Sequence, residues 1–172
     1  MNRTIGWLAA ILLASVTCLA AMAQQLKIEG FFFDAVPAVA GKDTRVSGII
    51  VDLYKAGAAL PVQTGVLALV DTGATESAVD EDLAVSVGLP VIDQVQGLAG
   101  GFQVRLTRYD CKIGFPGLKR SKSVECVGSP LKKNGNAFSI ILGMNMLRHF
   151  DLSMKAREGA VTLYPAWPEP AN

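Results

Sequence analysis

The chain has 172 residues, of which 16 are basic and 15 acidic, and its formal net charge is +1. No long basic run is present, so the composition gives no support to nucleic-acid binding. One histidine and three cysteines that do not cluster make a metal site unexpected. The sequence therefore predicts neither a nucleic-acid partner nor a metal or other cofactor.

Residues 1–23 have the three-part layout of a secretory signal peptide. Arg3 supplies the positive charge, residues 5–21 are almost continuously apolar, and Ala21-Met22-Ala23 offers the small residues that signal peptidase accepts. An uncleaved membrane anchor is the alternative, although the apolar run is short beside the roughly 20 residues that a span needs. We expect cleavage after Ala23, export to the periplasm or secretion, and no stable membrane span afterwards.

The 149 residues that remain have the length of one domain with room for a core. Arg3 is the only charged residue of the leader, so the remainder holds 15 basic and 15 acidic residues and no net charge. We expect strands that extend the domain over residues 24–64, a core over 65–165 and an irregular tail over 166–172.

Short apolar runs predict strands along most of this domain. They lie at residues 26–33, 45–53, 65–70, 102–109, 111–115, 123–127 and 138–142. A helical period predicts about three helical turns over 75–87, stopped by Gly88 and Pro90, and a shorter helix over 144–150. A hairpin over 152–164 closes the domain. The pattern is typical of an all-β, barrel-like fold with one or two short helices.

The motif with the most chemical information is Asp71-Thr72-Gly73-Ala74, which directly follows the apolar run 65–70. A buried strand end is a costly place for an ordinary carboxylate, because removing a charge from water is unfavourable. Gly73 allows a sharp turn that brings a backbone N–H to the carboxylate, and the Thr72 hydroxyl can hold the loop. Such a loop would present Asp71 at the floor of a cleft. An Asp that caps a turn before a helix is the alternative.

A second element, Ile141-Leu142-Gly143, ends an apolar strand roughly 70 residues later and leads into the helix predicted at 144–150. Together the two elements resemble the retropepsin-like aspartic proteases, which include retroviral and bacterial members. In that family Asp-Thr-Gly-Ala closes an apolar strand, a Gly-rich flap follows, and an apolar-apolar-Gly strand later passes beneath the catalytic loop. The resemblance spans residues 65–164 and implies the closed β-barrel of the acid-protease fold.

The resemblance assigns the flap to a Gly-rich stretch between the two elements, namely Gly97, Leu98, Ala99, Gly100 and Gly101. Glycine hinges suit a flap that opens and closes, and an ordinary hairpin loop is the alternative. Retroviral members carry Arg-Asp or Arg-Asn where this chain has Met144-Asn145, and that arginine braces their dimer. Glu76 and Arg148 are candidates to replace the missing ion pair.

The resemblance also implies a peptide-bond hydrolase in which two Asp carboxylates share one proton and activate a water. This chain has a single Asp-Thr-Gly, so we expect a homodimer that brings Asp71 of each subunit to a two-fold axis. The expected substrate is a peptide or protein bound in extended form. A non-catalytic peptide-binding module on the same fold is the main alternative, and a structural envelope protein with a coincidental motif is the other.

Cys111 and Cys126 fall on neighbouring predicted strands, in a protein whose leader directs it to a compartment that permits thiol oxidation. A disulfide between them would close a loop of about 15 residues and contribute roughly 3 kcal/mol. We expect this bridge, with two buried free thiols as the alternative.

Overall fold

The computed structural model describes residues 26–36, 44–99 and 102–166. The expected leader, residues 1–23, and the last part of the expected tail, residues 167–172, lie outside the described residues. Among the described residues, no helix has both the length and the apolar character that crossing a bilayer requires.

The described residues form ten strands and four short helices. The strands are β1 (Ile28–Asp34), β2 (Arg45–Lys55), β3 (Gln63–Val70), β4 (Ser77–Asp80), β5 (Val91–Ala99), β6 (Phe102–Phe115), β7 (Arg120–Ser129), β8 (Ile140–Leu142), β9 (Phe150–Lys155) and β10 (Ala160–Pro165). The α-helices are α2 (Glu81–Ser86) and α3 (Met144–Leu147), and the 3-10 helices are η1 (Pro116–Leu118) and η2 (Ala156–Glu158). The predicted all-β class is confirmed.

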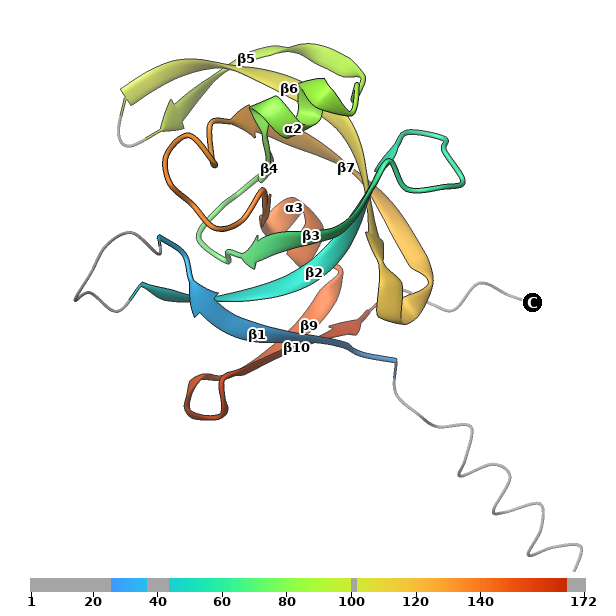
Figure 1. Cartoon of the computed structure of the whole chain (residues 1–172), viewed down its shortest axis with the longest axis vertical. Coiled ribbons are helices and arrows are strands. Elements are labelled where there is room, and N and C mark those ends of the chain that lie inside the picture. The colour runs from blue at the N-terminus through green and yellow to red at the C-terminus, as the bar shows by residue number, and fades with distance from the viewer. Residues whose placement is uncertain (1–25, 37–43, 100–101, 167–172) are drawn as a thin grey trace, which may run out of the picture.

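All ten strands belong to one sheet with the order β5-β6-β7-β4-β8-β3-β2-β1-β10-β9. A further pairing joins β6 to β2, from Asp52 opposite Gly114 to Lys55 opposite Cys111. The hydrogen-bonded ladder therefore returns to its starting strand through β2, β3, β8, β4, β7 and β6. The β5–β6 hairpin extends from one end of this ring, and β1, β10 and β9 lie at the other end (Figure 1).

The core fills the inside of the ring because the strands alternate between apolar and exposed positions. Along β2, Ile49, Val51 and Leu53 are fully buried, whereas Ile50 is 41% exposed. Fully burying one such side chain contributes about 1.5–3 kcal/mol. Phe115 of β6 packs edge to face on Phe150 of β9, with ring centroids 5.1 Å apart.

The helix predicted over 75–87 is correct only in its second half. Ser77–Asp80 form strand β4, which runs parallel to β7 and antiparallel to β8. All four of its residues are buried, because β4 fills the place between these two strands. The helical segment α2 begins only after Asp80, whose side chain caps it. A four-residue buried run fits a strand as well as a helix, and here strand pairing decides.

The two cysteines do lie on neighbouring strands, but both are buried free thiols, so the expected bridge is not formed in this structure. Cys111 is opposite Val124 and Cys126 is opposite Tyr109, which makes the cysteines diagonal neighbours. Diagonal Cα atoms are about 7–8 Å apart, beyond the roughly 4.4–6.8 Å that a disulfide spans. Contact with the Cys111 thiol, together with burial, raises the pKa of Cys126 well above its usual value.

Asp80 is a buried charged residue whose removal tests how the strand-to-helix junction is held. Its Oδ1 accepts from the Leu83 N–H at 3.2 Å, and its Oδ2 accepts from the Lys132 N–H at 2.9 Å. Asp80→Ala leaves both donors without this acceptor, so we expect a loss of about 1–3 kcal/mol in the free energy of unfolding. Urea unfolding measures it.

Asp82→Ala is the matched control, because Asp82 is exposed and forms only a surface ion pair with Lys133 at 3.0 Å. That variant should lose less than about 1 kcal/mol. Equal losses in the two variants would show that the Asp80 contacts contribute nothing of their own.

Candidate active site

The loop that carries Asp71 is fixed at its start by two neighbouring strands. Val70, the last residue of β3, lies opposite Leu142 of the parallel strand β8. The Asp71 N–H continues this ladder by donating to the Leu142 carbonyl at 3.1 Å. On the other side, the buried Ser47 hydroxyl donates to the Val70 carbonyl at 3.2 Å. The backbone that leads into Asp71 is therefore held by hydrogen bonds from both β2 and β8.

The Asp71 carboxylate is half-buried and is oriented by its own loop. Its Oδ1 accepts a hydrogen bond of 2.8 Å from the Gly73 N–H. The Ala74 N–H donates to the Asp71 carbonyl at 3.3 Å, which closes the turn. A Cβ at Gly73 would lie only 3.2 Å from the Asp71 Oδ1. Asp71 does not cap α2, whose N-cap is Asp80, but its bond to the Gly73 N–H does cap the turn 71–74.

The supporting strand and α3 hold the far side of the loop. Beyond Ile141 and Leu142, Gly143 is so close to the loop that a Cβ there would lie 2.4 Å from the Glu76 carbonyl oxygen. The next two residues also bind the loop through the backbone. The Met144 N–H donates to Ala74 O at 2.8 Å, and the Asn145 N–H donates to Thr75 O at 3.1 Å. The two sequence elements predicted to meet are thus in direct contact.

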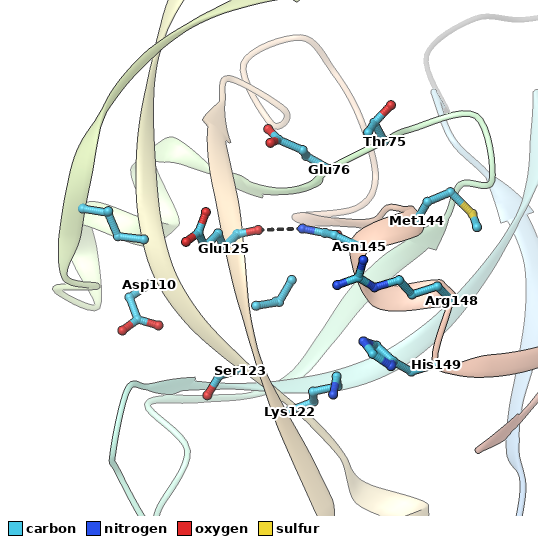
Figure 2. Close-up of a pocket in the computed structure, with 12 residues that line it drawn as sticks. Thr75, Glu76, Asp110, Lys122, Ser123, Glu125, Met144, Asn145, Arg148 and His149 are labelled. Carbon is cyan, nitrogen blue, oxygen red and sulfur yellow. Dashed lines mark hydrogen bonds between the residues drawn. The ribbon is translucent and has the colours of Figure 1, made fainter. Parts of the chain in front are cut away.

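Asn145 is a residue that sequence reasoning treated only as a departure from the retroviral pattern. Its Oδ1 accepts from both the Ser77 N–H, at 2.9 Å, and the Ser77 hydroxyl, at 2.7 Å. Its Nδ2 donates to the Glu125 carbonyl at 2.9 Å, a bond drawn in Figure 2. Ser77 Oγ in turn accepts from the Gly143 N–H at 3.1 Å. One neutral amide therefore joins α3, β4 and β7 below the Asp71 loop.

The ion pair suggested as a replacement for the retroviral arginine contact is not formed within one chain. Within the part of the chain that the structure describes, Glu76 and Arg148 make no ion pair with one another. Arg108 of β6 instead binds Asp93, with Nε 2.9 Å from Oδ1, and Glu125, at 2.9 Å. This hydrogen bond from Arg108 lowers the pKa of Asp93. Arg108 binds Asp93 through two bonds and Glu125 through a third, so these charges form a small network rather than an isolated surface pair.

A pocket of about 850 Å³ lies between the end of the catalytic loop, β7 and α3. Figure 2 shows Thr75 and Glu76 on one side of it, and Arg148, His149 and Lys122 on another. Burial, together with the nearby Lys122 and Arg148 charges, lowers the pKa of His149. No three His, Cys, Asp or Glu side chains of the described residues are placed to hold a metal ion.

The stretch assigned to the flap forms the end of the β5–β6 hairpin. Gly97, Leu98 and Ala99 belong to β5, and their backbones lie opposite Val104, Gln103 and Phe102 of β6. Gly100 and Gly101 lie outside the described residues. The stretch up to Ala99 is therefore an extended strand rather than the loop that its glycine content indicated.

Gly143 offers a direct test of the contact between the supporting strand and the catalytic loop. Gly143→Ala forces a methyl group against the Glu76 backbone, which cannot rotate away as a side chain would. We expect a loss of about 1–3 kcal/mol in the free energy of unfolding, because overpacking displaces backbone. Thermal and urea unfolding measure it. Gly117→Ala is the control, since Gly117 is exposed and has no atom within 4 Å of the added Cβ. Wild-type stability in Gly143→Ala would contradict the tight contact.

Comparison with known proteins gives one family and several similar folds. The aspartyl protease family matches residues 62–146, a span that runs from just before β3 to the middle of α3. No protein with a curated description matches the sequence.

Among solved structures, a retropepsin-like aspartic protease from Rickettsia conorii is similar with a TM-score of 0.50 and 13% identity, over 80% of this chain and 89% of that one. The retroviral protease-like domain of Ddi1 from Leishmania major has a TM-score of 0.46 and 18% identity, over 74% and 97% of the two chains. EIAV protease, complexed with the inhibitor HBY-793, has a TM-score of 0.42 and 18% identity, over 64% and 92%.

The family match covers the Asp71 loop and the strand beneath it, and the fold agrees with that of the Rickettsia enzyme. Over residues 62–146 this chain thus matches the aspartyl protease family, and its fold is that of a retropepsin-like protease.

Proposed function

We propose that this protein is an aspartic endopeptidase, a hydrolase whose catalytic residue is Asp71. The observation that carries the proposal is the placement of the Asp71 carboxylate. It is half-buried at the end of β3 and oriented by the Gly73 N–H at 2.8 Å. The loop that bears it is tied to α3 through Ala74 and Thr75. A carboxylate held in this way can act on a substrate without first reorganising, which favours catalysis over a capping role.

The proposed active unit is a homodimer, because each chain supplies a single Asp-Thr-Gly. A two-fold axis at the loop would bring Asp71 and its copy together. Two carboxylates at such a distance cannot both be ionised at low cost, so the pair would hold one proton between them. The two members would then act as one base and one acid.

The proposed reaction is the attack of water on a peptide carbonyl. The ionised Asp71 removes one proton from the water while the oxygen forms a bond to the carbonyl carbon. The protonated Asp71 of the second subunit gives its proton to the carbonyl oxygen. When the C–N bond breaks, the amine takes the proton held by the first Asp71, and a hydroxyl of the intermediate returns a proton to the second Asp71 as the carbonyl reforms. The pair ends with one proton, as it began.

The proposed substrate is a peptide or protein segment in extended form. Within the described residues, β5 is an outermost strand of the sheet, and it belongs to the hairpin assigned as the flap. An extended peptide can hydrogen-bond to such a strand edge through its backbone. Binding then depends first on the extended conformation of the peptide and only second on its side chains. Closure of the hairpin over a bound peptide would also exclude water from the site.

Hydrolysis of a mixed peptide library from acidic to neutral pH tests the proposal. We expect cleavage by the wild type and a loss of at least about a thousandfold in Asp71→Asn, because the amide can neither take up nor share the proton. Asp82→Asn, an exposed carboxylate on α2, is the matched control and should cleave at the wild-type rate.

The same experiment separates the two functions that the fold can serve. If the wild type is folded and dimeric but cleaves no peptide at any pH, the protease proposal is wrong. Saturable binding of extended peptides by such a protein would then favour a peptide-binding module. Equal cleavage by wild type and Asp71→Asn would place catalysis elsewhere.

We also propose that the protein is exported, on the strength of the apolar leader and the Ala21-Met22-Ala23 site. Expression of the full chain in a bacterial host with a periplasm should yield a protein that begins at Gln24. Intact mass after osmotic release measures this. An intact leader on membrane-bound protein would favour the anchor instead.

A further inference from the structure

The pocket beside the Asp71 loop carries opposite charges on its two sides. The acidic side chains that line it are Glu76, Asp110 and Glu125, and the basic ones are Lys122, Arg148 and His149. Figure 2 shows Arg148 and His149 on the side formed by α3, away from Asp110. We propose that this pocket is a specificity subsite in which Arg148 binds an acidic side chain of the peptide substrate. The inference rests on the proposed function and names the peptides that the protein would select.

The carboxylates at the pocket gather around Arg108 rather than around Arg148. The Arg108 guanidinium binds Asp93 through Nε at 2.9 Å and Glu125 through Nη1 at 2.9 Å. The hydrogen bond to Asp93 raises the pKa of Arg108, and the nearby charges of Glu125 and Glu76 add to this effect. These acidic side chains therefore have a cation of their own on β6, and they leave the Arg148 guanidinium to a ligand.

Three basic side chains lie close together on the other side of the pocket. Burial lowers the pKa of His149, and the charges of Lys122 and Arg148 lower it further. Among the residues that the structure describes, no carboxylate lies within ion-pair distance of Arg148. Like charges held near one another repel, and a carboxylate bound between them relieves that repulsion. A guanidinium also fits a carboxylate in shape, since it can donate two parallel hydrogen bonds to it.

Apolar side chains complete the wall of the pocket. Ile92 of β5 is 43% exposed, Met144 of α3 is 40% exposed, and Val124 of β7 also lines the cavity. The cavity of about 850 Å³ lies within the roughly 300–1,000 Å³ that is usual for ligand sites, so it can take more than one side chain of a peptide. We expect the methylene groups of a bound glutamate to contact this apolar wall.

The pocket is within reach of a peptide bound at Asp71. Thr75 lines the pocket and is four residues from Asp71, and four residues span at most about 14 Å. An extended peptide covers that distance in about four residues. Ile92 leads to the same place, because it belongs to β5, whose open edge is proposed to pair with the peptide. The acidic side chain is therefore expected about three to five residues from the bond that is cut.

Cleavage of matched peptides tests the subsite. A peptide that the wild type cuts is made with Glu, Gln or Lys at each position about three to five residues from the cut, on both sides. At about pH 6 a glutamate side chain is ionised. At one position kcat/KM should then be about fivefold to tenfold higher for Glu than for Gln, and lower for Lys than for Gln.

Substitution of Arg148 assigns the preference to this residue. Arg148→Gln should abolish it, mainly by raising KM for the Glu peptide, because the contact is the same in the ground state and the transition state. Arg148→Glu should reverse it in favour of the Lys peptide, a result that partial unfolding cannot produce. Arg157→Gln is the matched control and should keep the wild-type preference, since Arg157 is an exposed arginine of η2 outside the pocket.

Binding to the inactive Asp71→Asn variant separates the subsite from the chemistry. Fluorescence anisotropy with labelled Glu and Gln peptides gives the two dissociation constants, and the Glu peptide should bind about fivefold to tenfold more tightly. Adding Arg148→Gln to this variant should remove the difference. If the wild type cuts no peptide, the comparison uses peptides that it retains from the mixed library.

The outcomes distinguish this inference from the protease proposal. Asp71-dependent cleavage with no preference for Glu, or with a preference that survives Arg148→Gln, overturns the subsite and leaves the protease standing. A preference for Lys also overturns it and assigns specificity to the acidic side of the pocket. Arg148-dependent binding of the Glu peptide by a protein that cuts nothing supports the subsite and contradicts the protease. If no peptide is cut or retained, both proposals are wrong.

Discussion

The parallel pairing of β3 with β8 is the constraint on which the rest of the site depends. A charged side chain directly after a buried strand is costly, and it persists only where the surrounding backbone over-determines it. Here the ladder continues past β3 through the Asp71 N–H, and a Cβ on Gly143 would lie only 2.4 Å from the Glu76 carbonyl oxygen. This close approach restricts the conformation of the Asp71 loop and therefore the direction of the Asp71 carboxylate.

Asn145 shows how a neutral side chain can hold such a loop. An arginine–carboxylate contact fixes geometry through charge, and its contribution falls when water and salt reach it. The Asn145 amide uses three hydrogen bonds instead, two from Ser77 and one to Glu125, in a partly buried place. Hydrogen bonds between neutral groups are insensitive to salt and to the protonation of carboxylates nearby. The scaffold beneath Asp71 is thus independent of the charges that line the pocket beside it.

The sheet encloses a core and also ends in two strand edges that are unpaired on one side. The ring of paired strands has its core inside, whereas β5 and β9, the outermost strands of the described sheet, each keep one side unpaired. The first belongs to the hairpin proposed to cover substrate. Binding of an extended peptide to this edge would depend on backbone groups, so it places few demands on side-chain identity.

The sequence by itself determined the all-β class and most strands, because alternation and apolar runs record which residues face a core. The contact between the Asp71 loop and the Ile141-Leu142-Gly143 strand was implied by the resemblance of these two motifs to a known family. Only the tertiary structure decided that Ser77–Asp80 form a strand, that Cys111 and Cys126 stand diagonally, and that Asn145 reaches Ser77. Each of these depends on which strands become neighbours and in what register. Register is a property of pairs of distant segments, and no single segment encodes it.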